Sequence, residues 1–243
     1  MYQRAWLVLI AALIGVAVTA NMGFWQLRRA TQKVAMQTAM ESRSLLPELG
    51  AFDLARTSDE AEPQHYRRVH LRWHWVIDRT VFLDNRQMNG RVGFYVVTPL
   101  QLVDRPEVVL VQRGWVPRDQ LNRTLLPQVS TPRSVVDVTG TIAPPPARLY
   151  EFSGVAGGAI RQNLDVASFA IETGLSLLPL SVKQTDAISS ITADDALVRQ
   201  WPRPAVDVQK HYGYAFQWFA LSALMAGLYV WFQILRPRLQ RSV

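Results

Sequence analysis

Two uncharged apolar segments, one near each end of the chain, limit what this sequence can fold into. Residues 6–27 and 214–235 each run for 22 positions without an Asp, Glu, Lys or Arg. At about 1.5 Å per residue, each segment forms a helix of roughly 33 Å, long enough to cross the hydrocarbon core of a bilayer. We therefore predict two transmembrane helices, at residues 6–27 and 214–235.

The first apolar segment also resembles a cleavable signal peptide. Arg4 precedes it, and Val18-Thr19-Ala20 has the small residues of a cleavage site. The apolar run continues past that site to Leu27, which favours an uncleaved anchor.

The charges indicate a membrane protein and argue against a nucleic-acid-binding one. The net charge is +7, but all 19 acidic residues lie between Glu41 and Asp207, so the excess is concentrated in two acid-free ends. Basic residues flank both sides of the apolar segments, and the positive-inside rule does not choose an orientation. A two-span anchor places both tails on one side of the membrane; we expect tails 1–5 and 236–243 in the cytoplasm.

The absence of cysteine excludes thiol catalysis, disulfides and covalent haem attachment.

The segment between the spans, residues 28–213, has the pattern of a β domain. Val69, Leu71, Trp73 and Trp75 alternate with polar residues, as in a half-buried strand. The predicted fold class is membrane-anchored and mainly β: an antiparallel β domain, barrel- or sandwich-like with one or two short helices, between N- and C-terminal transmembrane helices. Further extended segments are expected at residues 80–83, 94–102, 108–116, 134–142 and 175–184, and a helix at 165–173, capped by Asp165 and ended by Gly174.

The domain contains no recognisable catalytic motif. Three of the four histidines, His65, His70 and His74, lie close together in the sequence. On a strand, however, His70 and His74 stand roughly 13 Å apart, too far to share one metal ion. We interpret them as part of a solvent-exposed strand face.

The fourth histidine lies at the mouth of the second span. Helical spacing places Tyr214, Ala215 and Trp218 on the same face as His211. An imidazole in this position can bind a haem iron axially, or it can anchor the helix at the lipid headgroups. The residues alone leave both interpretations open.

Two glutamines interrupt the apolar segments. Gln26 and Gln217 lie at similar depths if the two helices run antiparallel with their ends aligned. A buried amide in lipid requires a partner, so we expect the two helices to pack together or to hold a polar group.

Several short motifs follow one another along the chain. They are Gly23-Phe24-Trp25-Gln26-Leu27-Arg28-Arg29, Leu83-Asp84-Asn85-Arg86, Gly93-Phe94, Thr98-Pro99-Leu100, Val111-Gln112-Arg113-Gly114-Trp115-Val116-Pro117, Gln162-Asn163-Leu164-Asp165 and Lys210-His211-Tyr212-Gly213-Tyr214-Ala215-Phe216-Gln217-Trp218. Their order, together with the two terminal spans, resembles the surfeit locus protein one family of cytochrome c oxidase assembly factors.

The resemblance implies a function in respiratory-chain biogenesis. It implies a non-enzymatic factor for a haem–copper terminal oxidase, acting while haem a is placed in the catalytic subunit. The implied partners are that subunit, other oxidase or haem-synthesis assembly factors, and the lipid bilayer, with no nucleic acid. The implied location is the bacterial inner membrane, with both termini cytoplasmic and the domain periplasmic. The resemblance also favours His211 as an axial ligand of transiently bound haem a.

The remaining expected cofactor-binding residues surround His211 in the two spans. Trp25 and Gln26 would line the site, Tyr214 and Trp218 would stack on the macrocycle, and Arg28 would pair with haem propionates. Two other classes stay open: a protein-only membrane chaperone that stabilises the catalytic subunit without haem, and a membrane-anchored enzyme, which would need a polar catalytic cluster.

The motif at residues 113–117 has a predicted structural role. We expect Gly114 at a bulge or close backbone approach, and Pro117 at the end of its strand. Trp115 would anchor the domain core or rest on the membrane.

Overall fold

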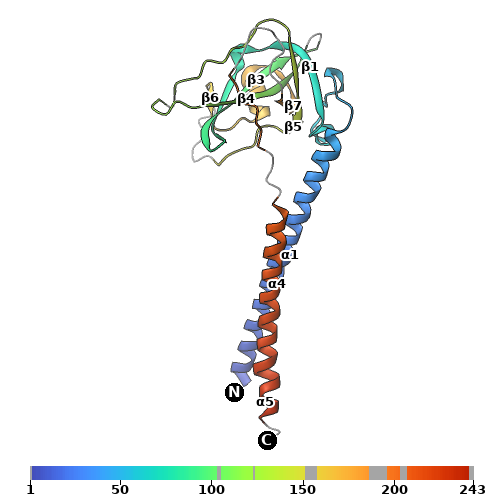
Figure 1. The fold of residues 1–243 in the computed structure, drawn as a ribbon, viewed down its shortest axis with the longest axis vertical. Coiled ribbons are helices and arrows are strands. Elements are labelled where there is room, and N and C mark those ends of the chain that lie inside the picture. Colours follow the sequence, from blue (N-terminus) through green and yellow to red (C-terminus); the bar gives the residue numbers. More distant parts are fainter. Residues whose placement is uncertain are drawn as a thin grey trace. The chain divides into compact units, whose positions relative to one another are not determined.

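The computed structural model describes residues 2–102, 105–122, 124–150, 158–185, 196–202 and 207–240 (Figure 1). The chain divides into a helical unit, Met1–Thr38 with Pro204–Val243, and a β unit, Ala39–Arg203. The predicted fold class is confirmed, because long apolar helices at both ends of the chain flank a β-rich domain with a few short helices.

The N-terminal helix is much longer than the predicted span. Helix α1 (Tyr2–Ser44) has 43 residues, or about 65 Å, roughly twice the thickness of the hydrocarbon core. It therefore continues without a break beyond residues 6–27. By length and composition, its apolar stretch can cross a membrane.

The C-terminal helix begins earlier than the predicted span. Helix α4 (Val208–Val230) starts six residues before the expected boundary at 214, so His211 lies in its first turn. A π-helical turn, η3 (Trp231–Leu235), and helix α5 (Arg236–Leu239) follow directly. Pro237 lacks the N–H that a regular α-helical ladder would need there, which accounts for the irregular turn before it.

The β unit is built around a closed five-stranded barrel (Figure 1). Strand pairing runs β1-β5-β7-β4-β3, and contacts of His74 and Trp75 with Gln101 and Leu100 close the ring between β1 and β3. Strand β2 extends the sheet from β3, and β6 pairs with β2. The strands are β1 (Arg68–Trp75), β2 (Val81–Met88), β3 (Arg91–Gln101), β4 (Glu107–Pro117), β5 (Val136–Ala143), β6 (Ile160–Arg161) and β7 (Ser176–Gln184).

Alternation along β1 builds the barrel core as predicted. Val69, Leu71, Trp73 and Trp75 are buried, while the residues between them are exposed. They pack with apolar side chains from the neighbouring strands, such as Ile142 on β5. The alternation thus separates the two faces of the strand.

The direction of one central pairing differs from the predicted antiparallel arrangement. Strand β7 pairs with β4 in parallel and with β5 antiparallel. The short β2–β6 pairing is also parallel. Hydrophobic alternation reports which face of a strand is buried and carries no information on the direction of its neighbour, so only the fold reveals these two pairings.

Short helices cover parts of the barrel. Helix α3 (Val166–Thr173) begins after Asp165 and ends at Gly174, which has the left-handed conformation, φ +69°, that favours glycine. This helix was predicted with the same two boundary residues. The others are η1 (Ala51–Asp53), α2 (Ser58–Gln64) and η2 (Ile77–Arg79).

Replacing Asp165 with alanine is expected to lower the melting temperature by roughly 2–4 °C at neutral pH. The carboxylate accepts hydrogen bonds from the backbone N and Oγ of Ser168 and pairs with Arg148. The bonds from Ser168 hold the pKa of Asp165 below its usual value. A carboxyl group whose pKa is lower in the folded state stabilises the fold at pH values above its unfolded-state pKa. That contribution disappears as the pH falls through the folded-state pKa.

Thermal unfolding at several pH values, followed by circular dichroism, tests this prediction. The difference between wild type and Asp165→Ala should shrink in acid. Glu48→Ala, which removes an exposed carboxylate, is the matched control and should unfold like the wild type. Equal losses in the two variants would contradict a capping role.

Candidate functional site

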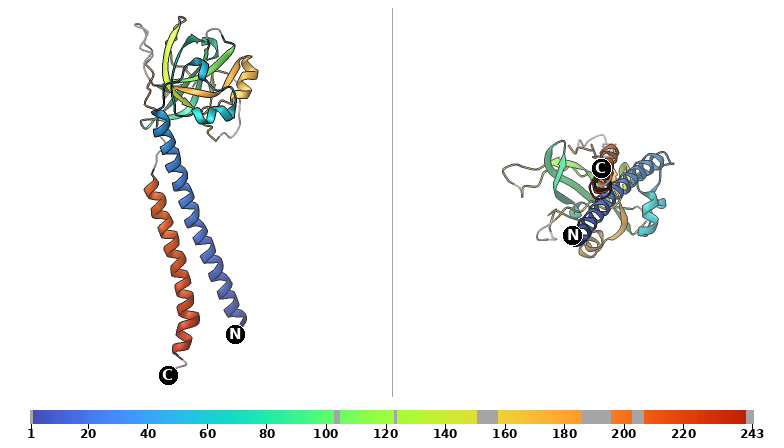
Figure 2. Two further views of the ribbon diagram at one scale, coloured as in Figure 1. Left: turned by 90° about the vertical axis from the view of Figure 1, so that its right-hand side faces the viewer. Right: turned by 90° about the horizontal axis from the view of Figure 1, so that it is seen from below.

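The two long helices pack against each other in opposite directions. Along α1, Gly15 lies against Met225 of α4, Gly23 lies against Phe219, and Gln26 meets His211. The residue numbers rise on one helix as they fall on the other, so the helices are antiparallel. The two termini therefore lie at the same end of the helical unit (Figure 2).

Small residues allow the helices to approach closely. A Cβ atom added to Gly23 would lie 2.7 Å from a ring carbon of Phe219, so only glycine fits the present spacing. The Phe219 ring also meets Phe24 edge to face, with ring centroids 5.1 Å apart. Close contact through small residues is typical of helix association in membranes.

The hydroxyl groups in this interface are bonded to backbone carbonyls. Thr19 Oγ1 donates to Gly15 O over 2.8 Å, and Ser222 Oγ on α4 donates to Val16 O on α1 over 3.3 Å. Both residues are buried. The second bond links the helices directly, which supports the predicted packing of the two spans.

The most specific polar contact joins His211 to Gln26. Nδ1 of His211 lies 2.8 Å from Oε1 of Gln26, and both side chains are half-buried. An amide oxygen can only accept a hydrogen bond, so Nδ1 is the donor. In the neutral ring, an Nδ1–H donor leaves the lone pair on Nε2, the arrangement that a histidine needs to bind a metal.

The other predicted site residues lie on the same two helices with their side chains more open. Trp25 and Tyr214 are each about half exposed (48% and 52%), and Arg28 is exposed. Trp218 is half-buried. Within the described part of the chain, no hydrogen bond or ring contact joins these four side chains to His211, so their assigned roles remain predictions.

Gln217 does not take the position that depth counting suggested. Its side chain is exposed, and Gln26 pairs with His211 six residues earlier on α4. Buried Ala215 precedes Gln217 by two residues, and two residues turn a helix by about 200°. Counting residues from the end of a helix gives the position of a side chain along the helix axis. It does not show whether that side chain lies on the face that contacts the other helix.

Asp207 and Lys210 are polar residues near His211 that sequence reasoning did not select. Asp207 precedes α4, and its Oδ2 lies 2.5 Å from Lys210 Nζ. The hydrogen bond from Lys210 lowers the pKa of Asp207, and the charge of Lys33 acts in the same direction. The predicted span began at residue 214, so both residues lay outside the expected helix.

The motif in β4 has structural roles. Trp115 is buried, and its indole Nε1 donates to the carbonyl of Arg86 over 2.9 Å, which identifies it as a core anchor. A Cβ added to Gly114 would lie 2.7 Å from Leu197 Cβ, at a bulge in the β3–β4 pairing. Pro117 is the last residue of β4. The predicted close approach and strand end are confirmed.

Arg113, in the same motif, is completely buried. Its guanidinium donates to Thr131 Oγ1 over 2.6 Å and to Ser130 O over 2.7 Å, and it lies 4.8 Å from the centroid of the Trp75 ring. These contacts tie the segment after β4 to the barrel. A buried arginine of this kind was not anticipated.

The histidines of β1 lie on the exposed face, as predicted. His70 is 3.5 Å from Asp137, and His74 Nδ1 lies 3.3 Å from the carbonyl of Arg133. His65, before the strand, is half-buried. Among the residues that the structure describes, no group of three potential ligands is placed to hold a metal ion.

Comparison with known proteins relates nearly the whole chain to one family. A sequence model of the SURF1 family matches residues 13–223. A SURF1-like protein of Rickettsia bellii is 26% identical over 225 residues, covering 90% of this chain and 88% of the relative. Cytochrome oxidase assembly protein SHY1 of Saccharomyces cerevisiae is 31% identical over 104 residues, which cover 43% of this chain and 26% of the relative. Surfeit locus protein 1 of Rattus norvegicus is 30% identical over 120 residues, which cover 44% of this chain and 38% of the relative.

Proposed function

The chain belongs to the SURF1 family, and from that membership we propose that it is a non-enzymatic assembly factor for a haem–copper terminal oxidase. The name of the yeast relative, a cytochrome oxidase assembly protein, supports this function. The two candidate membrane-spanning helices fit a factor that meets its target in the bilayer. The partner would be the catalytic subunit, together with other oxidase or haem-synthesis assembly factors.

The chain would hold haem a through His211 before the haem enters that subunit. The observation that carries this proposal is the hydrogen bond from His211 Nδ1 to Gln26. It fixes the ring orientation across two helices and leaves Nε2 as the ligand atom. With no cysteine in the chain, attachment would be by reversible ligation, which suits a cargo that must be released.

Neighbouring side chains would complete the site. Trp25 and Tyr214 expose ring surface on α1 and α4, and Trp218 lies two turns of helix after His211 on the same face. Arg28 would pair with propionates, because a guanidinium binds carboxylates in a bidentate manner. Gln26 acts through His211 and is a positioning residue.

The same proposal gives the orientation of the protein in the membrane. Antiparallel spans place both termini on one side of the membrane, which we assign to the cytoplasm of a bacterial cell. The β unit would then face the periplasm. Fusion of a periplasm-dependent reporter to either terminus should give no signal, whereas active fusions would contradict this topology.

Purification from a host that makes haem a tests the function. The expected product has a Soret band and retains the oxidase catalytic subunit. A colourless protein that still retains the subunit would instead identify a protein-only chaperone. A protein with neither property would overturn both functions.

Replacing Gln26 with leucine is expected to weaken haem binding by about 10–100-fold, as is typical when the partner of a metal-bound histidine is lost. Gln26→Glu keeps an oxygen acceptor for Nδ1 and should restore much of the affinity. Gln217→Leu removes an exposed amide from α4 and is the matched control. Haem titration followed at the Soret band measures all three, and equal affinities in the two leucine variants would exclude a positioning role.

A further inference from the structure

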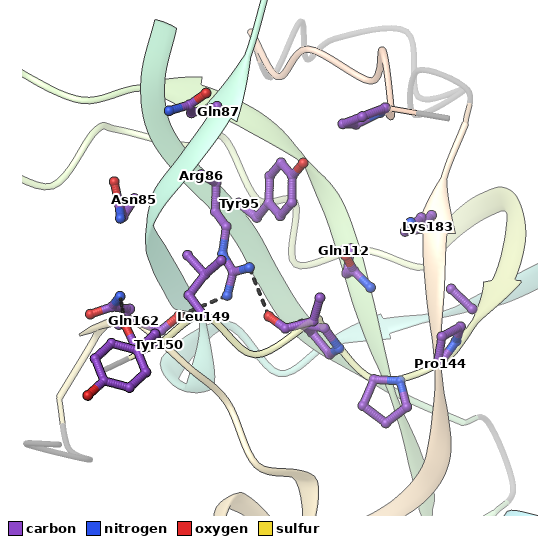
Figure 3. A pocket seen from close by; sticks show the side chains of 15 residues that line it. Asn85, Arg86, Gln87, Tyr95, Gln112, Pro144, Leu149, Tyr150, Gln162 and Lys183 are labelled. Atoms are coloured by element: carbon purple, nitrogen blue, oxygen red, sulfur yellow. Dashed lines mark hydrogen bonds between the residues drawn. The ribbon is translucent and has the colours of Figure 1, made fainter. Parts of the chain in front are cut away.

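The β unit contains a pocket of about 650 Å³ that the proposed haem site does not use (Figure 3). One wall is apolar, formed by Pro144, Pro145, Pro146 and Leu149. The lining also includes two cations, Arg86 and Lys183, and no acidic residue is among the described residues that line the pocket. The volume is in the range that accommodates a small organic ligand.

Arg86 is buried, and none of the described residues supplies an acid that neutralises it. Only 5% of the residue is exposed. Its Nη1 and Nη2 donate to the neutral carbonyls of Ala147 and Gln162, each over 2.8 Å, and its Nε has no hydrogen-bond partner among the described residues (Figure 3). Burial lowers the pKa of this guanidinium, and Tyr95 opposes the shift only in part. The site therefore favours a negative charge that the described residues do not supply.

A bulge in β2 helps to bring Arg86 to this position. The β2–β3 register shifts between Leu83 and Arg86, and Asn85 has a positive φ of 60°. Such a bulge re-aims the side chains that follow it. A left-handed asparagine in the middle of a strand costs conformational energy, which is consistent with a functional requirement for the position of Arg86.

Lys183 is the second cation. It lies on β7, and its Nζ is 5.8 Å from the centroid of the Trp201 ring. The Trp201 indole donates to Gln184 O over 2.7 Å, and its ring meets Tyr95 edge to face with centroids 5.1 Å apart. These contacts hold an aromatic side chain beside the ammonium. Burial alone lowers the pKa of Lys183.

We propose that this pocket binds a small organic carboxylate, with the anion neutralised by Arg86 and Lys183 and its apolar body against Pro144–Pro146. Burying the charge of Arg86 without an opposite charge is unfavourable, and half-buried Lys183 adds a second positive charge, so a bound anion relieves that cost. The apolar wall and the volume favour a ligand with a flat or branched hydrocarbon part over an inorganic anion. The pocket shares no lining residue with the proposed haem site, so the proposal does not depend on haem binding.

Isothermal titration calorimetry of the full-length protein with 2-naphthoate and the neutral 2-naphthamide tests the proposal. One charged hydrogen bond corresponds to roughly tenfold or more in affinity, so 2-naphthoate should bind at least about tenfold more tightly. Inorganic phosphate, which lacks an apolar body, should compete weakly. Equal affinity for the two naphthyl probes, or equal affinity for phosphate and 2-naphthoate, would overturn the assignment.

Two variants distinguish binding of 2-naphthoate in this pocket from a general attraction to cations on the protein surface. Lys183→Gln should remove most of the preference for 2-naphthoate, whereas Arg72→Gln, which removes an exposed cation from β1, should keep it. Equal losses in the two variants would count against the pocket. Salt provides a readout independent of any variant: raising the ionic strength should weaken binding of 2-naphthoate but not of 2-naphthamide.

Discussion

Protein carrying His211→Ala is expected to lose its Soret band when it is purified from a host that makes haem a. The substitution removes the only histidine of the helical unit and leaves Gln26 without the Nδ1 donor. Loss of the ligand itself should exceed the effect of losing its hydrogen-bond partner, so the affinity for haem should fall by more than about 100-fold. Absorbance per mole of purified protein is the measurement.

A matched substitution and a chemical rescue make this result specific. His74→Ala removes an exposed imidazole from β1 and should keep the full band. Added imidazole should restore part of the band in His211→Ala, because it can replace the missing ligand, whereas a merely packing role for His211 would not respond. A full band in His211→Ala would eliminate this residue as the ligand.

Protein carrying Gly93→Val is expected to lose about 3 kcal/mol of unfolding free energy in the β unit. A Cβ added at Gly93 would lie 2.2 Å from Val116 O and 2.6 Å from the ring of Trp115. Both contacts are on β4, which pairs with β3 at this point, so the larger side chain must separate two central strands. The displaced Trp115 ring would also lose its bond to the Arg86 carbonyl.

Chemical denaturation followed by tryptophan fluorescence measures this loss. Gly50→Ala is the control, because a Cβ there would meet only an Asp53 oxygen at an ordinary distance of 3.5 Å. It should leave the unfolding midpoint nearly unchanged. A stability of Gly93→Val within experimental error of the wild type would show that β3 and β4 can separate at little cost.

Much of the fold could be predicted because local patterns report local structure. The alternation of β1 correctly separated its buried and exposed residues, and Asp165 and Gly174 correctly marked the ends of α3. The pairing of β4 with β7 could not be predicted in this way. Residues 107–117 and 176–184 meet through the path of the intervening chain, and neither strand encodes the direction of the other.

The candidate site was predicted in part. His211 and Gln26 stood out because polar side chains are costly beside long apolar runs. Their pairing was not expected, since it depends on where α4 begins and on how far each helix is rotated about its axis. The cationic pocket was invisible in the sequence, because Arg86 and Lys183 are almost a hundred residues apart and converge only when the barrel closes.

The sequence by itself determined two terminal helices apolar enough to cross a membrane, the β character of the segment between them, and a short list of polar residues at the ends of those helices. These properties follow from hydrophobic burial and from hydrogen-bonding requirements that act over a few neighbouring residues. Only the tertiary structure decided which of those residues meet and which strands close the barrel. Contacts between distant segments depend on helix rotation and strand register, and these are set by packing of the whole chain.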